Sequence, residues 1–264
     1  MQITNYKKIQ NKKLIVFDLD GTLAPTKAQM DREMDKLITV LLKQKKVAII
    51  GGGKWGLFKH QFLNELTAPK VLYKNLFMFP TTGTTFLHYK QGWKRVYEHK
   101  LSPLEVKAIY KAIQIVLKEI NYTSPKKTYG KIVENRGSQI TWSALGQDVV
   151  KVLGKKGIEL KNAWRDKQAP LKLKIAQHLK KYLPNLEIHS AGHTSIDITK
   201  KGIDKAYGIR QMEKYLKVKI KDMLFVGDAI FPGGNDFPAL KSGVDYVKVK
   251  SPEDTKQLIQ AILK

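Results

Sequence analysis

Cysteine is absent from this chain of 264 residues, and long apolar runs are missing as well. Without cysteine the protein has no disulfides, no thiolate metal ligands and no thiol nucleophile. No apolar run approaches the roughly 20 residues of a membrane-spanning helix, so we expect no membrane partner. Residues Met1–Lys13 are polar and basic with no apolar segment of signal-peptide type after them. We therefore expect a soluble, cytoplasmic protein.

Arginine is also scarce, although the chain is strongly basic. The formal net charge is +25, and 43 of the 48 basic residues are lysines. Such a charge invites a nucleic-acid-binding hypothesis, because phosphate backbones attract cations. However, the lysines are spread along the chain, and base readout and stacking favour arginine. We interpret the lysines as a solvated surface that attracts anionic sugar phosphates, and we expect no nucleic-acid partner. A lysine-rich nucleic-acid-binding protein on a degenerate enzyme fold is kept as an alternative.

The most informative segment that is present is Leu14–Thr22, with the sequence LIVFDLDGT. Four apolar residues typical of a buried parallel strand lead to Asp18, Asp20 follows two positions later, and Gly21 permits a sharp turn. Ligands of open α/β sheets bind at the carboxyl ends of strands. Two neighbouring carboxylates there indicate a bound Mg²⁺ and an anionic substrate. One carboxylate can attack phosphorus to form an aspartyl phosphate, and the other can transfer the proton.

Two later segments complete the pattern. Phe225–Asp236 reads FVGDAIFPGGND, so a second apolar strand delivers Asp228 and a glycine-rich turn then delivers Asp236. Acids that converge from different strands suit Mg²⁺, and we expect Asp18 and Asp228 to bind it with support from Asp236. In Ser195–Lys205, Lys201 stands beside a glycine in order between the two acidic motifs, and we expect it to neutralise phosphoryl charge.

The order of apolar patterns predicts an α/β fold with two domains. The first strand, helix and strand form a βαβ unit, which requires a parallel, Rossmann-like sheet. The middle of the chain follows a β-β-α-β-β-α-β-β order, which fits an antiparallel sheet backed by helices. We expect a core of residues 1–82 and 187–264 with an inserted α+β cap of residues 83–186. The expected strands are 14–18, 47–50, 76–79, 84–89, 93–98, 132–134, 139–143, 186–190, 195–198 and 224–226, and the expected helices are 29–44, 103–120 and 170–182.

The motifs resemble those of the haloacid dehalogenase (HAD) superfamily, in its branch with a C2b cap. Within that branch the chain is similar to eukaryotic-type phosphomannomutases and their bacterial relatives. The resemblance covers nearly the full length, and its most specific part is the string GDxxxPGGND. Beyond the first motif it is carried by Phe79-Pro80, Pro125-Lys126-Lys127, Glu134-Asn135-Arg136-Gly137, Ser195–Asp197, Lys201-Gly202, Asp204-Lys205 and Gly227–Asp236.

The resemblance implies a role for each matching residue. Asp18 is implied as the nucleophile and Asp20 as the acid/base. Asp18, the backbone carbonyl of Asp20 and Asp228 are implied to hold Mg²⁺, with Asp236 in support, and Lys201 to stabilise the phosphoryl group. The sequence leaves open whether the chain forms a homodimer through the cap. The implied substrate-binding residues are Thr22, Gly52, Gly53, Arg136, Ser195 and Asp197, with Arg136 on the distal phosphate of the substrate.

Several positions depart from the family pattern. Gly53 stands where the family has serine or threonine, although the backbone amides of Gly51–Lys54 could still form an anion nest. Family arginines are replaced by Lys27, by Thr128-Tyr129 and by Gln147. A mutase must hold a bisphosphorylated intermediate while it turns, which requires a strong phosphate clamp. We therefore favour a Mg²⁺-dependent sugar-phosphate phosphatase, with phosphomannomutase activity as the alternative.

Overall fold

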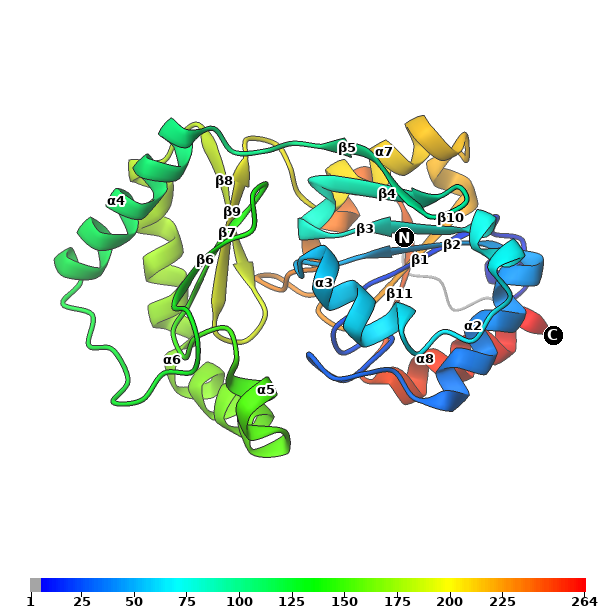
Figure 1. Ribbon diagram of the computed structural model, residues 1–264, viewed down its shortest axis with the longest axis horizontal. Coiled ribbons are helices and arrows are strands. Elements are labelled where there is room, and N and C mark those ends of the chain that lie inside the picture. The colour runs from blue at the N-terminus through cyan, green and yellow to red at the C-terminus, as the bar shows by residue number, and fades with distance from the viewer. Residues whose placement is uncertain (1–5) are drawn as a thin grey trace. The chain divides into compact units, whose positions relative to one another are not determined.

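The structure is a computed structural model that describes residues 6–264, and the chain forms two compact units (Figure 1). The core unit comprises residues 6–98, 204–232 and 236–264, and the cap unit comprises residues 99–203 with 233–235. Within the described range, no helix is both long enough and apolar enough to cross a membrane. Part of the Met1–Lys13 segment, which we expected not to be a signal peptide, lies outside the described residues.

The core unit is built on a seven-stranded sheet with the order β11-β10-β1-β2-β3-β4-β5. Its first five strands in that order run parallel, and β4 and β5 are antiparallel to their neighbours. In the register, Phe17 of β1 lies opposite Val226 of β10, so these two strands end side by side. The strands are β1 (Leu14–Phe17), β2 (Lys46–Ile50), β3 (Leu76–Phe79), β4 (Thr85–Tyr89), β5 (Trp93–Glu98), β10 (Met223–Gly227) and β11 (Asp245–Lys248).

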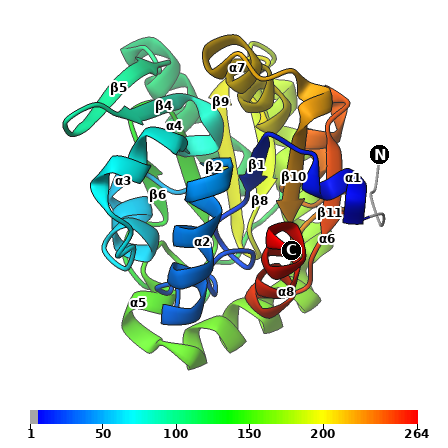
Figure 2. The same cartoon turned by 90° about the vertical axis from the view of Figure 1, so that its right-hand side faces the viewer.

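Helices cover both faces of this sheet. Ile15 and Phe17 pack into one apolar cluster with α2 (Arg32–Gln44) and α8 (Pro252–Leu263), which lie side by side in Figure 2. Leu14 and Val16 pack on the opposite face against α7 (Lys205–Leu216). This alternation follows from the strand period of two residues, and it explains why the central strands are apolar throughout. The shorter helical segments of the core are α1 (Tyr6–Gln10), α3 (Trp55–Phe58), a π-helical turn at Lys59–Leu63, and 3₁₀ turns at Lys70–Asn75, Thr81–Gly83, Ile220–Asp222 and Phe237–Ser242.

The cap unit contains a four-stranded antiparallel sheet with the order β6-β7-β9-β8. Helices α4 (Pro103–Glu119) and α6 (Lys155–Tyr182) cover one side of it, as Figure 1 shows, and enclose a core around Trp142. Helix α4 begins with a capping box in which Ser102 and Glu105 satisfy each other's backbone amides. The remaining elements are β6 (Val133–Asn135), β7 (Ile140–Ser143), α5 (Val149–Leu153), β8 (Leu186–Ala191) and β9 (Ser195–Lys200).

The domain boundaries differ from those expected from the sequence. The hairpin β4–β5, assigned to the cap, extends the core sheet, because β4 pairs with β3 and Phe86 stacks on Phe79 at 4.5 Å between ring centroids. Strands β8 and β9 mostly fell within the expected core, but β9 pairs with β7 in the cap sheet. The expected helix at 170–182 is also longer, since α6 begins at Lys155 and Pro170 lies inside it. The mixed α/β class itself is confirmed.

Candidate active site

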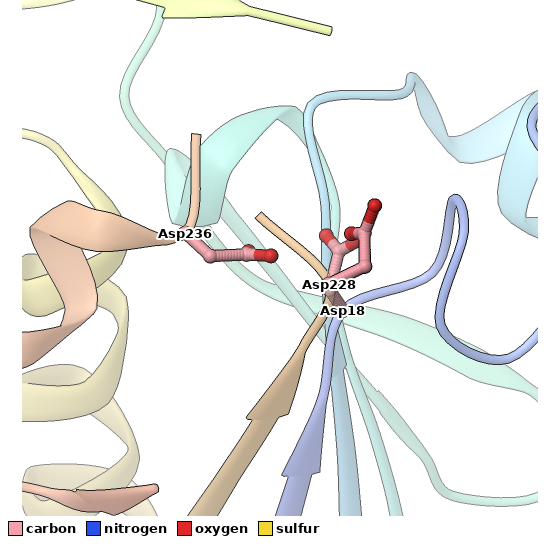
Figure 3. A group of neighbouring side chains, drawn as sticks. All are labelled: Asp18, Asp228 and Asp236. Carbon is pink, nitrogen blue, oxygen red and sulfur yellow. The ribbon is translucent and has the colours of Figure 1, made fainter. Parts of the chain in front are cut away.

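Three carboxylates converge at the carboxyl ends of the central core strands. Asp18 follows β1 directly, and Asp228 follows the neighbouring β10. Figure 3 shows these two side chains next to each other, with Asp236 pointing toward them from a different segment. Each acid offers one oxygen that lies within 4.8 Å of the oxygens offered by the other two. Asp18 is 2% exposed and Asp236 is fully buried, so this is an interior acidic cluster.

Two glycines let the backbone approach these carboxylates. Gly21 has a φ of +85°, and a Cβ there would lie 2.6 Å from Oδ2 of Asp228. A Cβ on Gly227 would lie 2.5 Å from Oδ2 of Asp236. Neither distance is compatible with a side chain, so the turn after Asp20 and the end of β10 both depend on glycine. The glycines of the two acidic motifs therefore make room for the carboxylates as well as turning the chain.

A buried lysine, Lys205, completes the cluster. Its ammonium donates to Oδ1 of Asp18 at 2.5 Å and also to Oδ1 of Asp236, and the side chain is only 2% exposed. Lys205 is the first residue of α7, directly after the N-cap Asp204, whose side chain accepts from the amide of Tyr207 at 2.9 Å. Burial disfavours the charged form of Lys205, but the attraction of Asp18 and Asp236 outweighs it and raises the pKa of the ammonium.

The expected role of Lys201 in neutralising phosphoryl charge stays a prediction, and the structure places this residue in the other unit. Lys201 belongs to the cap unit, where its ammonium donates to the backbone carbonyl of Pro184 at 2.5 Å. In the core unit, the lysine that contacts Asp18 is Lys205. Both lysines lie in the same motif, and no sequence pattern distinguished Lys205 from Lys201.

The carboxylates carry perturbed acidities. Burial raises the pKa of Asp18 well above its usual range, Lys205 opposes this, and repulsion from Asp236 and Asp228 adds to it. Burial and repulsion from Asp236 raise the pKa of Asp228 to about 6, with Lys205 acting in the opposite direction. The single positive charge of Lys205 therefore does not neutralise the three carboxyl groups of the cluster, and further positive charge would stabilise their ionised forms.

The donor set fits a hard divalent cation. Oδ2 of Asp18 and Oδ1 of Asp228 are buried and have no hydrogen-bond partner among residues 6–264. Carboxylate oxygens are preferred ligands of Mg²⁺, and buried unpaired oxygens are costly without a partner. The residues present thus suit a Mg²⁺ ion held by Asp18 and Asp228 with Asp236 close by. That the backbone carbonyl of Asp20 also binds the ion stays a prediction.

Asp20 is held by groups that the sequence patterns did not single out. Its Oδ1 accepts from the backbone amide of Lys27 at 2.7 Å and from Nε2 of Gln61 at 2.9 Å. The same Gln61 nitrogen also donates to the carbonyl of Ala28 at 3.1 Å. Gln61 is fully buried and comes from the π-helical turn after α3. No local motif marks this residue, because its partner lies 41 positions away.

The expected phosphate cradle is less developed than its glycines suggested. Gly52 and Gly53 follow β2, but Gly51 donates its amide to the carbonyl of Phe79 at 3.3 Å. The helix that follows, α3, has only four residues, which gives a small dipole. Thr22 is fully buried, and its hydroxyl has no hydrogen-bond partner within the described part of the chain. A role for these residues in substrate binding stays a prediction.

The remaining expected substrate residues lie on the cap sheet. Ser195 and Asp197 alternate along β9 with Ile196 and Ile198, which face the cap core, so the two polar residues share the other face. Asp197 accepts from the hydroxyl of Thr141 at 2.7 Å.

Arg136 follows β6 in the same unit. It donates from Nε to Glu134 at 2.8 Å and from Nη2 to the side-chain oxygen of Gln147 at 3.0 Å. Gln147, at a position where the family has arginine, thus accepts a hydrogen bond from the arginine that remains.

Comparison with known proteins identifies the class. The core sheet brings buried carboxylates and a lysine together at its carboxyl edge, where ligands of open α/β sheets bind. The family model described as haloacid dehalogenase-like hydrolase matches residues 15–243. The chain therefore belongs to the haloacid dehalogenase-like hydrolases and is an enzyme. Members of this family generally use Mg²⁺, in agreement with the acidic cluster.

Curated relatives and solved structures extend the comparison. The chain is 26% identical to the phosphomannomutase of Encephalitozoon cuniculi, over 96% of this chain and 94% of that protein. It is also 26% identical to the phosphomannomutase of Saccharomyces cerevisiae, over 93% and 92%. Among solved structures, a truncated, IMP-bound IMP-nucleotidase of Plasmodium falciparum superimposes with a TM-score of 0.72 at 17% identity, over 98% of this chain and 71% of that one. Trehalose-6-phosphate phosphatase of Aspergillus fumigatus gives 0.57 at 16% identity, over 100% and 99%.

Proposed function

We propose that this enzyme transfers a phosphoryl group on a hexose phosphate through Asp18 and that the net reaction is a phosphomutase reaction of the phosphomannomutase type. The observation that carries the phosphoryl-transfer step is the state of Asp18, a buried carboxylate with one oxygen on Lys205 and the other without a partner among residues 6–264. The similarity of nearly the whole chain to curated phosphomannomutases supports the mutase outcome. This preference reverses the one drawn from the sequence, which put hydrolysis first.

The proposed chemistry uses four groups of the core unit. In the first half, a carboxylate oxygen of Asp18 attacks one phosphorus of a hexose bisphosphate, the bond from that phosphorus to the sugar oxygen breaks, and Asp20 gives a proton to that oxygen. Phosphorylated Asp18 and a hexose monophosphate remain. Lys205 holds the attacking carboxylate in position and neutralises negative charge beside it. Gln61 keeps the Asp20 carboxyl group oriented for the proton transfer. A Mg²⁺ ion held by Asp18 and Asp228 would neutralise charge on the phosphoryl oxygens.

The second half of the proposed reaction returns the phosphoryl group to the sugar. Asp20 takes the proton from the free hydroxyl of a hexose 1-phosphate, that oxygen attacks the phosphorus of phosphorylated Asp18, and the carboxylate is released with formation of the bisphosphate. After the bisphosphate has turned, Asp18 takes up its other phosphoryl group and the 6-phosphate is left. We assign recognition of the sugar phosphate to the polar face of the cap sheet, with Arg136 for the phosphate that does not react and with Ser195 and Asp197 for hydroxyl groups. The glutamate and glutamine that bond Arg136 would fix its guanidinium for this task.

Net hydrolysis is the second candidate, and the replaced arginines favour it. Gln147 and Tyr129 carry no positive charge, and a charge-assisted hydrogen bond contributes roughly 1.5–3 kcal/mol. Without two such contacts, the binding of the sugar-phosphate intermediate would be weaker by on the order of 3–6 kcal/mol if the contacts were additive. If the hexose monophosphate dissociates before it receives the phosphoryl group, water can attack phosphorylated Asp18, and free phosphate is then released.

One experiment separates the two outcomes. The enzyme is supplied with mannose 1-phosphate or glucose 1-phosphate, Mg²⁺ and a hexose bisphosphate activator, and the 6-phosphate product and free phosphate are measured in the same sample. We expect the 6-phosphate to exceed free phosphate. Dominant free phosphate that falls further in Arg136→Ala would establish the phosphatase instead. Neither product, from a folded protein with Mg²⁺, would contradict phosphoryl transfer on hexose phosphates.

A further inference from the structure

The polar face of the cap sheet carries a chain of hydrogen bonds between side chains. Ile140 and Trp142 of β7 face the cap core, so Thr141 lies on the opposite face of the strand. Thr141 pairs in the register with Asp197 of β9, and its hydroxyl donates to Oδ1 of Asp197 at 2.7 Å. Nε2 of Gln139, just before β7, donates to the Thr141 hydroxyl at 3.0 Å. Neither Gln139 nor Thr141 has a role in the reaction proposed above.

The chemistry of the three groups gives these hydrogen bonds one direction. An amide nitrogen only donates, an ionised carboxylate only accepts, and a hydroxyl group has a single proton to donate. The Thr141 hydroxyl therefore accepts from Gln139 and directs its proton to Asp197. Gln139 fixes the orientation of the hydroxyl, and the hydroxyl fixes the orientation of the carboxylate.

Burial makes this arrangement persistent. Gln139 is fully buried, Thr141 is 2% exposed and Asp197 is 4% exposed. A buried polar group that loses its hydrogen-bond partner is costly, so the three side chains are held in one geometry before any ligand arrives. A binding group that is held in advance loses less conformational freedom when the ligand binds.

A second chain of hydrogen bonds joins Thr141 to the residue assigned to the distal phosphate. Nη2 of Arg136 donates to Oε1 of Gln147 at 3.0 Å, and Nε2 of Gln147 makes a longer contact of 3.4 Å with the backbone carbonyl of Thr141. Thr141 is thus connected both to the arginine assigned to phosphate and to the aspartate assigned to sugar hydroxyl groups. This position suits a residue that orients the site without touching the ligand.

We propose that Thr141 and Gln139 are positioning residues, which hold the Asp197 carboxylate for hydrogen bonds from sugar hydroxyl groups and so favour a hexose phosphate over phosphate alone. The inference rests on the proposed function, in which Asp197 binds these hydroxyl groups. A hydroxyl that meets a misplaced acceptor loses the hydrogen bond it made with water and gains none in return. Inorganic phosphate has no sugar hydroxyl, so its binding should not depend on the orientation of Asp197.

The test compares the binding of two ligands by isothermal titration calorimetry. Glucose 1-phosphate and inorganic phosphate are titrated separately into Asp18→Asn protein, the parent, so that no turnover occurs. Thr141→Val keeps the shape of the side chain without its hydroxyl, and we expect it to weaken glucose 1-phosphate binding about tenfold and inorganic phosphate binding less than about twofold. Thr141→Ser retains the hydroxyl and should restore most of the affinity for glucose 1-phosphate. Gln139→Met leaves the hydroxyl without its donor and should weaken glucose 1-phosphate binding about threefold.

Thr199→Val is the matched control. Thr199 is a fully buried threonine of the same cap sheet, and its hydroxyl donates to the backbone carbonyl of Ile203 at 3.0 Å. Its replacement removes one buried hydroxyl, as Thr141→Val does, and should lower the Tm to a similar extent. It should leave the affinity for both ligands unchanged.

Three results would overturn the inference. Thr141→Val may bind glucose 1-phosphate as tightly as the parent, weaken both ligands equally, or have the same effect on glucose 1-phosphate as Thr199→Val, and the last two would make the role of Thr141 structural. If Thr141→Val does not fold, Gln139→Met decides by the same comparison of ligands. Failure of the proposed function gives a different result, because the parent itself would then bind inorganic phosphate but not glucose 1-phosphate, and both proposals would be wrong.

Discussion

Lys205 and Asp18 are 187 positions apart in the chain, yet the lysine ammonium lies 2.5 Å from a carboxylate oxygen of Asp18, and both side chains are buried. The pair joins the start of α7 to the end of β1, and Asp236 shares the same ammonium. A buried ion pair is costly to form and costly to break, because removal of one partner leaves an uncompensated charge. The pair therefore has consequences for both activity and stability.

The first prediction compares two lysines of one motif. Lys205→Met should lower kcat by at least about 100-fold, because it removes the positive charge that positions the nucleophile. Lys201→Met should leave kcat close to that of the unaltered enzyme, since Lys201 contacts only the carbonyl of Pro184 among the interactions described for its ammonium. Steady-state kinetics and thermal unfolding of both variants check this. The reverse order of effects would restore the sequence-based assignment.

The comparison of these lysines shows which site residues could be predicted from the sequence and which could not. The residues that follow β1 and β10 were predictable, because an apolar strand that ends in an acid places that acid at the carboxyl edge of a sheet. The choice between Lys201 and Lys205 was not, since it depends on which side of the unit boundary each residue folds. The contact of Gln61 could not be predicted for a related reason, because it is a hydrogen bond to Asp20, which is distant in the sequence.

The expected boundaries of the two units also differ from those in the structure for a physical reason. The hairpin β4–β5 has the same local pattern as a hairpin of the cap, and only its non-local pairing with β3 places it in the core sheet. Likewise, β9 reads as a strand in either unit until its pairing with β7 is known. Short-range patterns specify strands, whereas the choice of partner depends on cross-strand packing.

The second prediction concerns the nucleophile. Asp18→Asn should abolish turnover while the fold remains intact, because the amide has nearly the shape of the carboxylate but cannot attack phosphorus. Circular dichroism and a phosphate-release assay on the purified variant provide the measurement. Full turnover by a folded Asp18→Asn protein would remove Asp18 from the mechanism.

The third prediction concerns the orientation of Asp20. Gln61→Leu removes the side-chain hydrogen bond to Asp20 at similar volume, and we expect kcat to fall by about 10- to 100-fold because proton transfer depends on a positioned acid. Gln61→Asn serves as the shorter amide control. A lower Tm with an unchanged kcat would assign Gln61 a purely structural role.

The fourth prediction concerns the metal. Activity should require Mg²⁺ and should be inhibited by Ca²⁺, because Ca²⁺ accepts more and longer oxygen contacts and would disturb the arrangement of the three acids. The measurement is turnover after chelation, followed by addition of each ion at equal concentration. Undiminished turnover after exhaustive chelation would contradict a metal-dependent reaction.

The last prediction links the raised pKa of Asp228 to metal binding without any use of activity. A carboxyl group whose pKa is about 6 in the folded protein, above its ordinary value of 3.8, stabilises the metal-free fold at low pH. That contribution is lost as the pH rises from about 4 to about 6 and the buried group ionises, at a cost on the order of 3 kcal/mol. A cation that binds the ionised carboxylates should offset this cost. Mg²⁺ should therefore raise the Tm by several degrees at pH 7.5 and by less at pH 5.

The matched control is Asp228→Asn, which removes one ionisable ligand and should reduce the effect of Mg²⁺ at pH 7.5 while making the metal-free Tm less dependent on pH between 4 and 6. The measurement is differential scanning fluorimetry with and without Mg²⁺ at each pH. Equal Tm increments at pH 5 and pH 7.5, unchanged in Asp228→Asn, would show that the cation binds elsewhere. A larger Tm increment at pH 7.5 that is lost in the variant would place the cation at Asp228, because protons and the cation compete for the carboxylate of Asp228.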